Sequence, residues 1–126
     1  MNYRLHTSKT AEEYLKQLHM VLNITPNIIA RIAVALSLRD PTPIELSEPD
    51  RSGMEFNRST LTGEYDYLFK CLIAQHLGKS ISDEEYFPNL FNAHLERGIR
   101  ILKNEYKMAG NSEKLFRTLI LMGDDS

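Results

Sequence analysis

The sequence has little cysteine and no long hydrophobic run. Cys71 is the single cysteine of the 126 residues, so no disulfide can form within the chain. A lone cysteine is typical of a reducing compartment, and we therefore expect a cytoplasmic protein. The longest apolar runs are far shorter than the roughly 20 residues that span a bilayer, and the polar, charged start does not fit a signal peptide. We expect no membrane partner.

The motifs of common catalytic and metal sites are also missing. The sequence has no glycine-rich phosphate loop, no paired cysteines and no histidine pair at ligand spacing. Its four histidines are scattered over separate segments. Cys71 is not placed at the start of a predicted helix, so it is more typical of a packing residue than of a sulfur carrier. We predict no metal, no cofactor and no catalytic residue, and hence no enzyme.

An excess of positive charge is lacking too. The formal net charge is −2, from 15 basic and 17 acidic residues, whereas a nucleic-acid-binding surface is normally basic. Acidic residues gather at 45–50, 83–85 and 124–125, and these segments contain no lysine or arginine. The basic residues therefore lie elsewhere, and an oligomer would repeat any local basic patch without changing the average.

The composition, with 42% hydrophobic and 25% charged residues, is that of one ordinary globular domain over 1–126. Residues 1–8 alternate between apolar and polar side chains, which predicts a half-buried strand. A helix follows, capped by Ser8 or by Thr10 in a capping box with Glu13. Thr25 and Pro26 mark the start of the next helix. Strand, helix, turn and helix form the order of a ribbon-helix-helix unit over 1–39.

In a ribbon-helix-helix unit the strand pairs with the strand of a second subunit, and its outward side chains can enter the DNA major groove. Here those side chains would be Arg4 and His6. Because a ribbon topology fixes no function by itself, an ordinary solvated edge strand is an equal interpretation.

The second helix, predicted over 26–38, carries Arg31 as its only charge and is apolar around nearly its whole circumference. Such a helix must be buried on all sides. A chain of this size buries only about two-thirds of its surface, so we expect a contact between subunits through Ile29, Ala33 and Leu36. The alternative is the central helix of a monomeric bundle.

The second half, 56–122, is predicted to be helical, which makes the class mostly α. Residues 40–57 are proline-rich and predict a loop with a short extended piece at 44–46. A helix after Gly63 ends at Gly78, and Ser82 and Glu85 form a capping box. A long helix over 88–108 has Gly98 on its apolar side, and a last helix begins near Ser112. The apolar faces are expected at Tyr65, Leu68, Phe69, Leu72, Ile73 and Leu77 in the first of these helices, and at Phe91, Leu95, Ile99, Leu102 and Tyr106 in the long one.

The candidate DNA contacts are basic side chains. Arg100, Lys103 and Lys107 fall within about 60° of one another on the long helix at 100° per residue, with Arg97 further round. Glu96 lies on the same side, so a solvated face with an ion pair is the alternative. Arg4, Lys9 and Lys16 near the strand and first helix are further candidates.

Three stretches together resemble the DndE family, small proteins of the DNA phosphorothioate modification system. They are RLHTSKTAEEYLKQLHMVLNITPNIIARIAVALSLRDP (4–41), FNRSTLTGEYDYLFKCLIAQHLG (56–78) and NLFNAHLERGIRILKN (89–104). Within the last two, Gly63-Glu64-Tyr65 and the segment from His94 to Ile99 are similar to the family's signature stretches.

This resemblance implies a cytoplasmic homo-oligomer, namely a tetramer, that binds DNA and prefers nicked duplex. It further implies a non-catalytic partner of the proteins that insert sulfur in place of a phosphate oxygen. Two other functions stay open from the residues alone. One is a ribbon-helix-helix regulator that reads an operator, and the other is a protein-interaction adaptor that uses the apolar C-terminal helix and binds no DNA.

Overall fold

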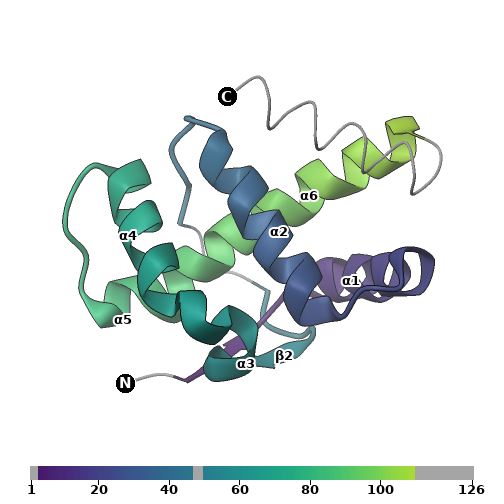
Figure 1. The fold of residues 1–126 in the computed structure, drawn as a ribbon, viewed down its shortest axis with the longest axis horizontal. Helices are drawn as coiled ribbons and strands as arrows, with labels where there is room; N and C mark the ends of the chain where they lie inside the picture. The colour runs from purple at the N-terminus through teal and green to yellow at the C-terminus, as the bar shows by residue number, and fades with distance from the viewer. Residues whose placement is uncertain (1–2, 47–49, 110–126) are drawn as a thin grey trace.

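The computed structural model describes residues 3–46 and 50–109. Figure 1 shows a mostly helical protein, which confirms the predicted class. The elements in chain order are β1 (Arg4–His6), α1 (Lys9–Leu22), α2 (Pro26–Arg39), β2 (Glu55–Asn57), α3 (Arg58–Thr62), the single turn η1 (Gly63–Tyr65), α4 (Asp66–Leu77), α5 (Asp83–Glu85), the irregular turn η2 (Tyr86–Leu90) and α6 (Phe91–Ala109).

The centre of the fold is the crossing of α2 over α6, which is visible in Figure 1. Gly98 of α6 lies against the backbone of Ala33 in α2, so closely that a Cβ atom at position 98 would overlap the Ala33 carbonyl. Leu95, Ile99 and Leu102 on the same side of α6 are fully buried. The close approach predicted from Gly98 is therefore confirmed.

Local signals explain where the first two helices begin and end. The Ser8 hydroxyl accepts a hydrogen bond from the Ala11 amide, so Ser8 rather than Thr10 caps α1. Asn23 ends α1 in the left-handed conformation, with φ of 56°. Thr25 and Pro26 begin α2 as predicted, although the Thr25 side chain makes no cap hydrogen bond. The two helices are bent by 110° relative to each other.

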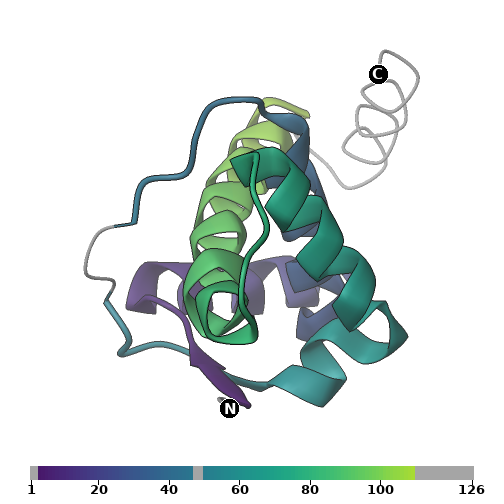
Figure 2. The same cartoon turned by 90° about the vertical axis from the view of Figure 1, so that its left-hand side faces the viewer.

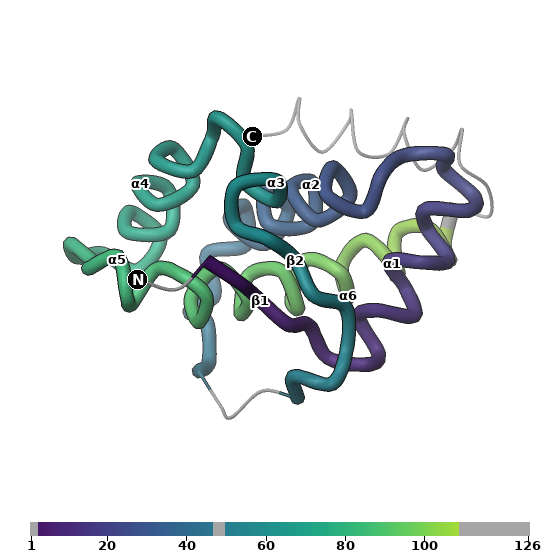
Figure 3. The backbone as a smooth tube through the Cα atoms, turned by 90° about the horizontal axis from the view of Figure 1, so that it is seen from below, coloured from purple at the N-terminus to yellow at the C-terminus, as the bar shows by residue number. Residues whose placement is uncertain are grey.

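The strand β1 pairs with β2 of the same chain, in an antiparallel register that places Leu5 opposite Phe56. Figure 3 shows this ribbon running beneath α6. The predicted pairing with a strand of a second subunit is therefore wrong. The extended piece predicted at 44–46 is also misplaced, because Phe56, buried between exposed Glu55 and Asn57, has the alternation that β1 needs in a partner.

The apolar helix α2 is buried on one side only. Ile29, Ala33 and Leu36 lie in the core of their own chain, and the prediction that they contact another subunit is wrong. The opposite side is open, because Ile28 is 43% exposed and Ala35 is exposed as well. Packing against α6 and α1 of the same chain buries the side of α2 that was predicted to contact another subunit.

The helix α4 ends at Gly78, which has a left-handed φ of 88° as the sequence predicted. Only Phe69 and Ile73 of its predicted apolar face are buried. Four other side chains expected in the core are exposed, namely Tyr65, Leu68, Leu72 and Leu77. The periodicity correctly predicted a helix, but the apolar stripe is wider than the surface that the chain offers to cover it.

A charge network fixes α3, α4 and α5 to one another. The buried Arg58 guanidinium donates to the carboxylates of Asp66 and Asp83 at 2.7–3.0 Å and lies over the rings of Tyr86 and Phe87. Hydrogen bonds from Arg58 lower the pKa of Asp83. The predicted capping box of Ser82 and Glu85 is confirmed at α5. These charge-assisted hydrogen bonds from one guanidinium to two carboxylates hold α3, α4 and α5 together, because the short elements among them bury little hydrophobic surface.

On α6 the predicted core residues Phe91, Leu95, Ile99 and Leu102 are buried, while Tyr106 is half-buried. The helix predicted from Ser112 lies outside the described residues. No single helix in 3–46 and 50–109 is long and apolar enough to cross a membrane, and α1 with α2 meets that length and composition only as a sharply bent pair.

We predict that Gly98→Ala destabilises the protein, although alanine is about 1 kcal/mol better than glycine in a helix. The added methyl must push α6 away from Ala33, which we expect to cost at least about 3 kcal/mol, the upper range for overpacked cores. Urea denaturation of the variant measures this change in the free energy of unfolding. The matched control, Asn104→Ala on the exposed side of α6, should unfold like the wild type, and a Gly98→Ala protein of wild-type stability would contradict the close packing.

Candidate nucleic-acid interface

The side of α6 that faces away from α2 carries the cations. Arg100 and Lys107 are exposed. The Lys103 ammonium lies 4.2 Å from the centre of the Tyr14 ring, so it packs over α1 while remaining partly accessible. The helical spacing predicted from the sequence therefore places two of the three side chains in solvent and the third against an aromatic ring.

Glu96 forms no ion pair with these cations. Its carboxylate accepts hydrogen bonds from the Ser8 amide at 2.7 Å and from the Ser8 hydroxyl at 3.0 Å, which ties α6 to the start of α1. Among the described residues, no carboxylate forms an ion pair with Arg100 or Lys107. The alternative of a self-compensated solvated face is weakened, because the acid that would compensate it is used elsewhere.

Arg97, which the sequence grouped with the basic stripe, is a structural residue. Only 13% of its side chain is exposed. Its guanidinium donates to the carbonyls of Ser37, Asp40 and Thr42 at 2.6–3.1 Å. These bonds attach the segment that follows α2 to the flank of α6. Arg97 is thus corrected from a DNA contact to a clamp.

The same clamp includes a buried chain of hydrogen bonds. Nε of Arg97 donates to the Ser37 hydroxyl at 2.8 Å, and the same hydroxyl is hydrogen-bonded to Nδ1 of His94, also at 2.8 Å. Burial lowers the pKa of the His94 imidazole to about 3, and the neighbouring His76 and Arg97 add to the shift. His94 is therefore neutral in the folded protein.

His76 completes this layer from α4. Its Nε2 lies 2.7 Å from the Asp40 carbonyl and 3.3 Å from the Arg97 guanidinium. The His76 and His94 rings meet edge to face with centroids 4.8 Å apart. Two histidines are therefore brought together, but among the described residues no group of three His, Cys, Asp or Glu side chains could hold a metal ion.

The N-terminal candidates lie on separate elements and already have acidic neighbours. Arg4 on β1 donates to Glu55 at 2.6 Å, and His6 lies 3.9 Å from the same carboxylate. Lys9 and Lys16 both pair with Glu12, at 3.0 and 3.2 Å. These cations are exposed, but their charge is partly compensated, unlike that of Arg100 and Lys107. Cys71 is exposed on α4.

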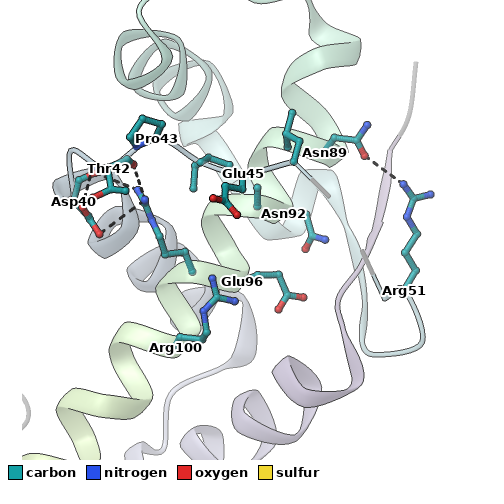
Figure 4. Close-up of a pocket in the computed structure, with 13 residues that line it drawn as sticks. Asp40, Thr42, Pro43, Glu45, Arg51, Asn89, Asn92, Glu96 and Arg100 are labelled. Atoms are coloured by element: carbon teal, nitrogen blue, oxygen red, sulfur yellow. Dashed lines mark hydrogen bonds and ion pairs between the residues drawn. The ribbon is translucent and has the colours of Figure 1, made fainter. Parts of the chain in front are cut away.

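A cavity beside this helix was not foreseen from the sequence. We call residues 40–46 the strap, and Figure 2 shows it standing away from α6. Between the strap and α6 lies an open cavity of about 850 Å³. Figure 4 shows the side chains around it, with Arg100 and Arg51 on opposite sides and Asn92 between them. No local motif marks the cavity, because its residues come from three separated stretches of the chain.

The fold and these side chains define a small helical protein that presents a cationic helix face. Residues 4–110 match the family model described as DNA sulphur modification protein DndE. This match spans most of the sequence, and the chain belongs to the DndE family, as the resemblance of its three stretches implied.

Two solved structures have a similar fold. One is described as DndE from Escherichia coli B7A involved in DNA phosphorothioation modification, with a TM-score of 0.67 at 24% identity, covering 81% of this chain and 97% of that one. The other is a mutant DndE involved in DNA phosphorothioation, with a TM-score of 0.64 at 25% identity, covering 82% and 99%. A comparison with curated proteins gave no match.

We predict a pH-dependent loss of stability that arises from His94. Its pKa is lower in the folded protein than the ordinary 6.5, so the unfolded chain takes up a proton first as the pH falls. The stabilisation is complete above pH 6.5 and is lost on the way toward pH 3, with a loss of about 2 kcal/mol by pH 5.

Thermal melts across this range should show a fall for the wild type and for the control His6→Gln, whose histidine is exposed, and a smaller fall for His94→Gln. Histidine ring resonances in NMR follow the titration directly. A His94 ring that titrates near 6.5 in the folded protein would contradict the buried, neutral assignment.

Proposed function

We propose that this protein is a non-catalytic DNA-binding subunit of the phosphorothioate modification system in the cytoplasm, which binds duplex DNA as a homo-oligomer, a tetramer by the family resemblance, and prefers a nicked duplex. Membership of the DndE family supports the pathway. The observation that carries DNA binding is the exposed pair Arg100 and Lys107, neither of which forms an ion pair among the described residues, while Glu96, one turn from Arg100, bonds to Ser8.

The contacts expected from this face are with phosphates. Cations on one helix face hold a nucleic-acid backbone without reading base edges, so binding should have little sequence preference. Because an oligomer repeats the face in each subunit, several weak contacts can add along one duplex despite the net charge of −2 per chain. Phosphate-directed binding suits a system whose modification replaces a phosphate oxygen.

A preference for nicked DNA has a mechanical basis. Intact duplex is stiff over about 150 base pairs, and bending a short site by a large angle costs of order 1–6 kcal/mol. A nick interrupts one strand and removes much of this cost. If the cationic faces of neighbouring subunits do not lie on one straight line, a nicked duplex can reach more of them than an intact one.

We further propose that the subunits meet through α4. Leu68 and Leu72 fall on one side of this helix and Tyr65 lies directly before it in η1, and all three side chains are exposed rather than packed in the described core. A contiguous exposed apolar stripe is typical of an interface. This surface replaces Ile29, Ala33 and Leu36, which are in the core.

The double variant Arg100→Gln with Lys107→Gln should bind DNA less tightly, by a similar factor for unrelated sequences. Removing one phosphate contact should reduce the slope of log affinity against log salt by about one unit. Fluorescence anisotropy with labelled random duplexes at several salt concentrations measures both quantities. Folding should survive, because both side chains are exposed.

The control is Lys79→Gln, which removes an exposed charge from the loop after α4 and should leave affinity and slope unchanged. If the double variant retains the wild-type slope, α6 is not the DNA-binding face, and Arg4, Lys9 and Lys16 become the candidates to test.

The double variant Leu68→Glu with Leu72→Glu tests the interface. Placing two carboxylates in an apolar contact between subunits should dissociate the oligomer, whereas an exposed face of a folded chain tolerates them. Light scattering after size exclusion gives the mass, and circular dichroism checks the fold. Lys79→Glu, exposed in the loop that follows α4, changes the charge by the same amount outside this stripe and is the control for added charge. An unchanged mass would place the interface elsewhere.

A further inference from the structure

The cavity between the strap and α6 contains charged groups of two kinds. Some are used by the fold. Glu96 bonds to Ser8, Arg97 bonds to backbone carbonyls, and Asp40 accepts from the Thr42 amide at 2.9 Å. Others remain available. Arg100 has no ion pair within the described residues, and Arg51 makes one long contact of 3.4 Å, to Asn89. Glu45 also lines the cavity and forms no hydrogen bond or ion pair with the described residues, so the available groups are two cations and one carboxylate, and they favour a ligand with a negative charge.

The most informative side chain is Asn92. It lines the cavity and is only 5% exposed. Its Oδ1 atom is buried and accepts no hydrogen bond from the described residues. An unpaired buried acceptor costs roughly 1–3 kcal/mol, and most buried polar groups in folded proteins are paired. A leucine of similar size would avoid this cost, so the amide at this position indicates a group that binds it.

The unpaired oxygen narrows the chemistry of that group. The charged oxygens of an anion only accept hydrogen bonds, so they pair with the two arginines but not with Oδ1 of Asn92. The ligand must carry a hydrogen-bond donor as well as a negative charge. A side-chain amide, turned about its freely adjustable terminal torsion, matches the adjacent donor and acceptor on the edge of a nucleobase, adenine above all.

We propose that this cavity binds a single nucleotide, with its base edge on the Asn92 amide and phosphate oxygens on the arginines at either side, Arg51 and Arg100. The proposal rests on the proposed function, since a strand held along α6 reaches the cavity at Arg100, which belongs to both surfaces. About 850 Å³ is ample for one nucleotide with water around it. The cavity would then hold a nucleotide of an unpaired or displaced strand, or a free nucleotide of the same chemistry.

The test compares two variants by isothermal titration with deoxyadenosine monophosphate and with a short single-stranded oligodeoxyadenylate. Asn92→Leu and Arg51→Gln should each weaken binding of the oligonucleotide about tenfold or more, the discrimination of a good amide–base pair. Asn92→Leu should melt at or above the wild-type temperature, because it removes a buried oxygen that has no hydrogen-bond partner in the described part of the chain. Asn104→Leu, exposed on the same helix, is the matched control.

The mononucleotide and the oligonucleotide together show whether the ligand is a free nucleotide or part of a DNA strand. Binding of the oligonucleotide with weak binding of the mononucleotide assigns the cavity to a DNA strand, and comparable binding of both assigns it to a free nucleotide. The proposal is overturned if Asn92→Leu and Arg51→Gln bind the oligonucleotide as the wild type does, or if inorganic phosphate or polyglutamate competes equally well. Should Asn92→Leu fail to fold, Arg51→Gln, which changes an exposed residue, decides alone.

The proposed function is tested separately, in the same experiment, with a flush-ended intact duplex. If that duplex still binds through Lys107 while no nucleotide binds, the cavity proposal fails and the DNA-binding proposal stands. If the nucleotides bind and the duplex does not, the DNA-binding proposal fails.

Discussion

The contact between the backbones of α2 and α6 at Ala33 and Gly98 is the constraint on which the rest of the structure depends. With no side chain at position 98, the two helices approach closely enough for Ser37 to reach both His94 and Arg97. Arg97 then holds the strap to α6 through the backbone carbonyls of Asp40 and Thr42. The cavity exists because the strap is held at its root while its remainder stands away.

The same crossing decides which side of α6 is available for function. One side is committed to α2 and the core. The other side points outward, where Glu96 bonds to Ser8 and so leaves Arg100 without an ion-pair partner in the described part of the chain. A chain with a net charge of −2 can thereby present a local cationic surface, because several of its acids bond to other parts of the fold. Glu96 bonds to Ser8 at the start of α1, Glu85 is part of the capping box of α5, and Asp66 and Asp83 pair with Arg58.

The sequence predicted what depends on neighbouring residues along the chain. The start of α2 at Pro26, the stop at Gly78, the capping box at Ser82 and the close packing of Gly98 were all found in the structure, since each follows from local backbone chemistry. The candidate site was predicted only in part. Arg100 and Lys107 are exposed as expected, but helical spacing could not show that Arg97 turns to carbonyls 55 to 60 positions away.

Long-range pairing also explains the other errors. The β1 partner lies at 55–57, with Leu5 paired to Phe56, in a stretch whose proline and glycine content predicted a loop. The apolar side chains of α2 were assigned to an oligomer because nothing local shows that α6 covers them. The unpaired Asn92 and the cavity around it could not be predicted for the same reason, because they depend on contacts between distant residues. An asparagine in a helix has no sequence signal that distinguishes a buried amide from a solvated one.

The central property proposed for this family member is that it binds DNA through phosphates, without reading sequence. The most direct test is a gel-shift titration of the wild-type protein with intact, nicked and single-stranded DNA of random sequence at physiological salt. We predict binding that is tightest for the nicked duplex and insensitive to unrelated competitor sequences. No binding to any of the three, or a preference of about 10³ or more for one particular duplex sequence, would contradict it.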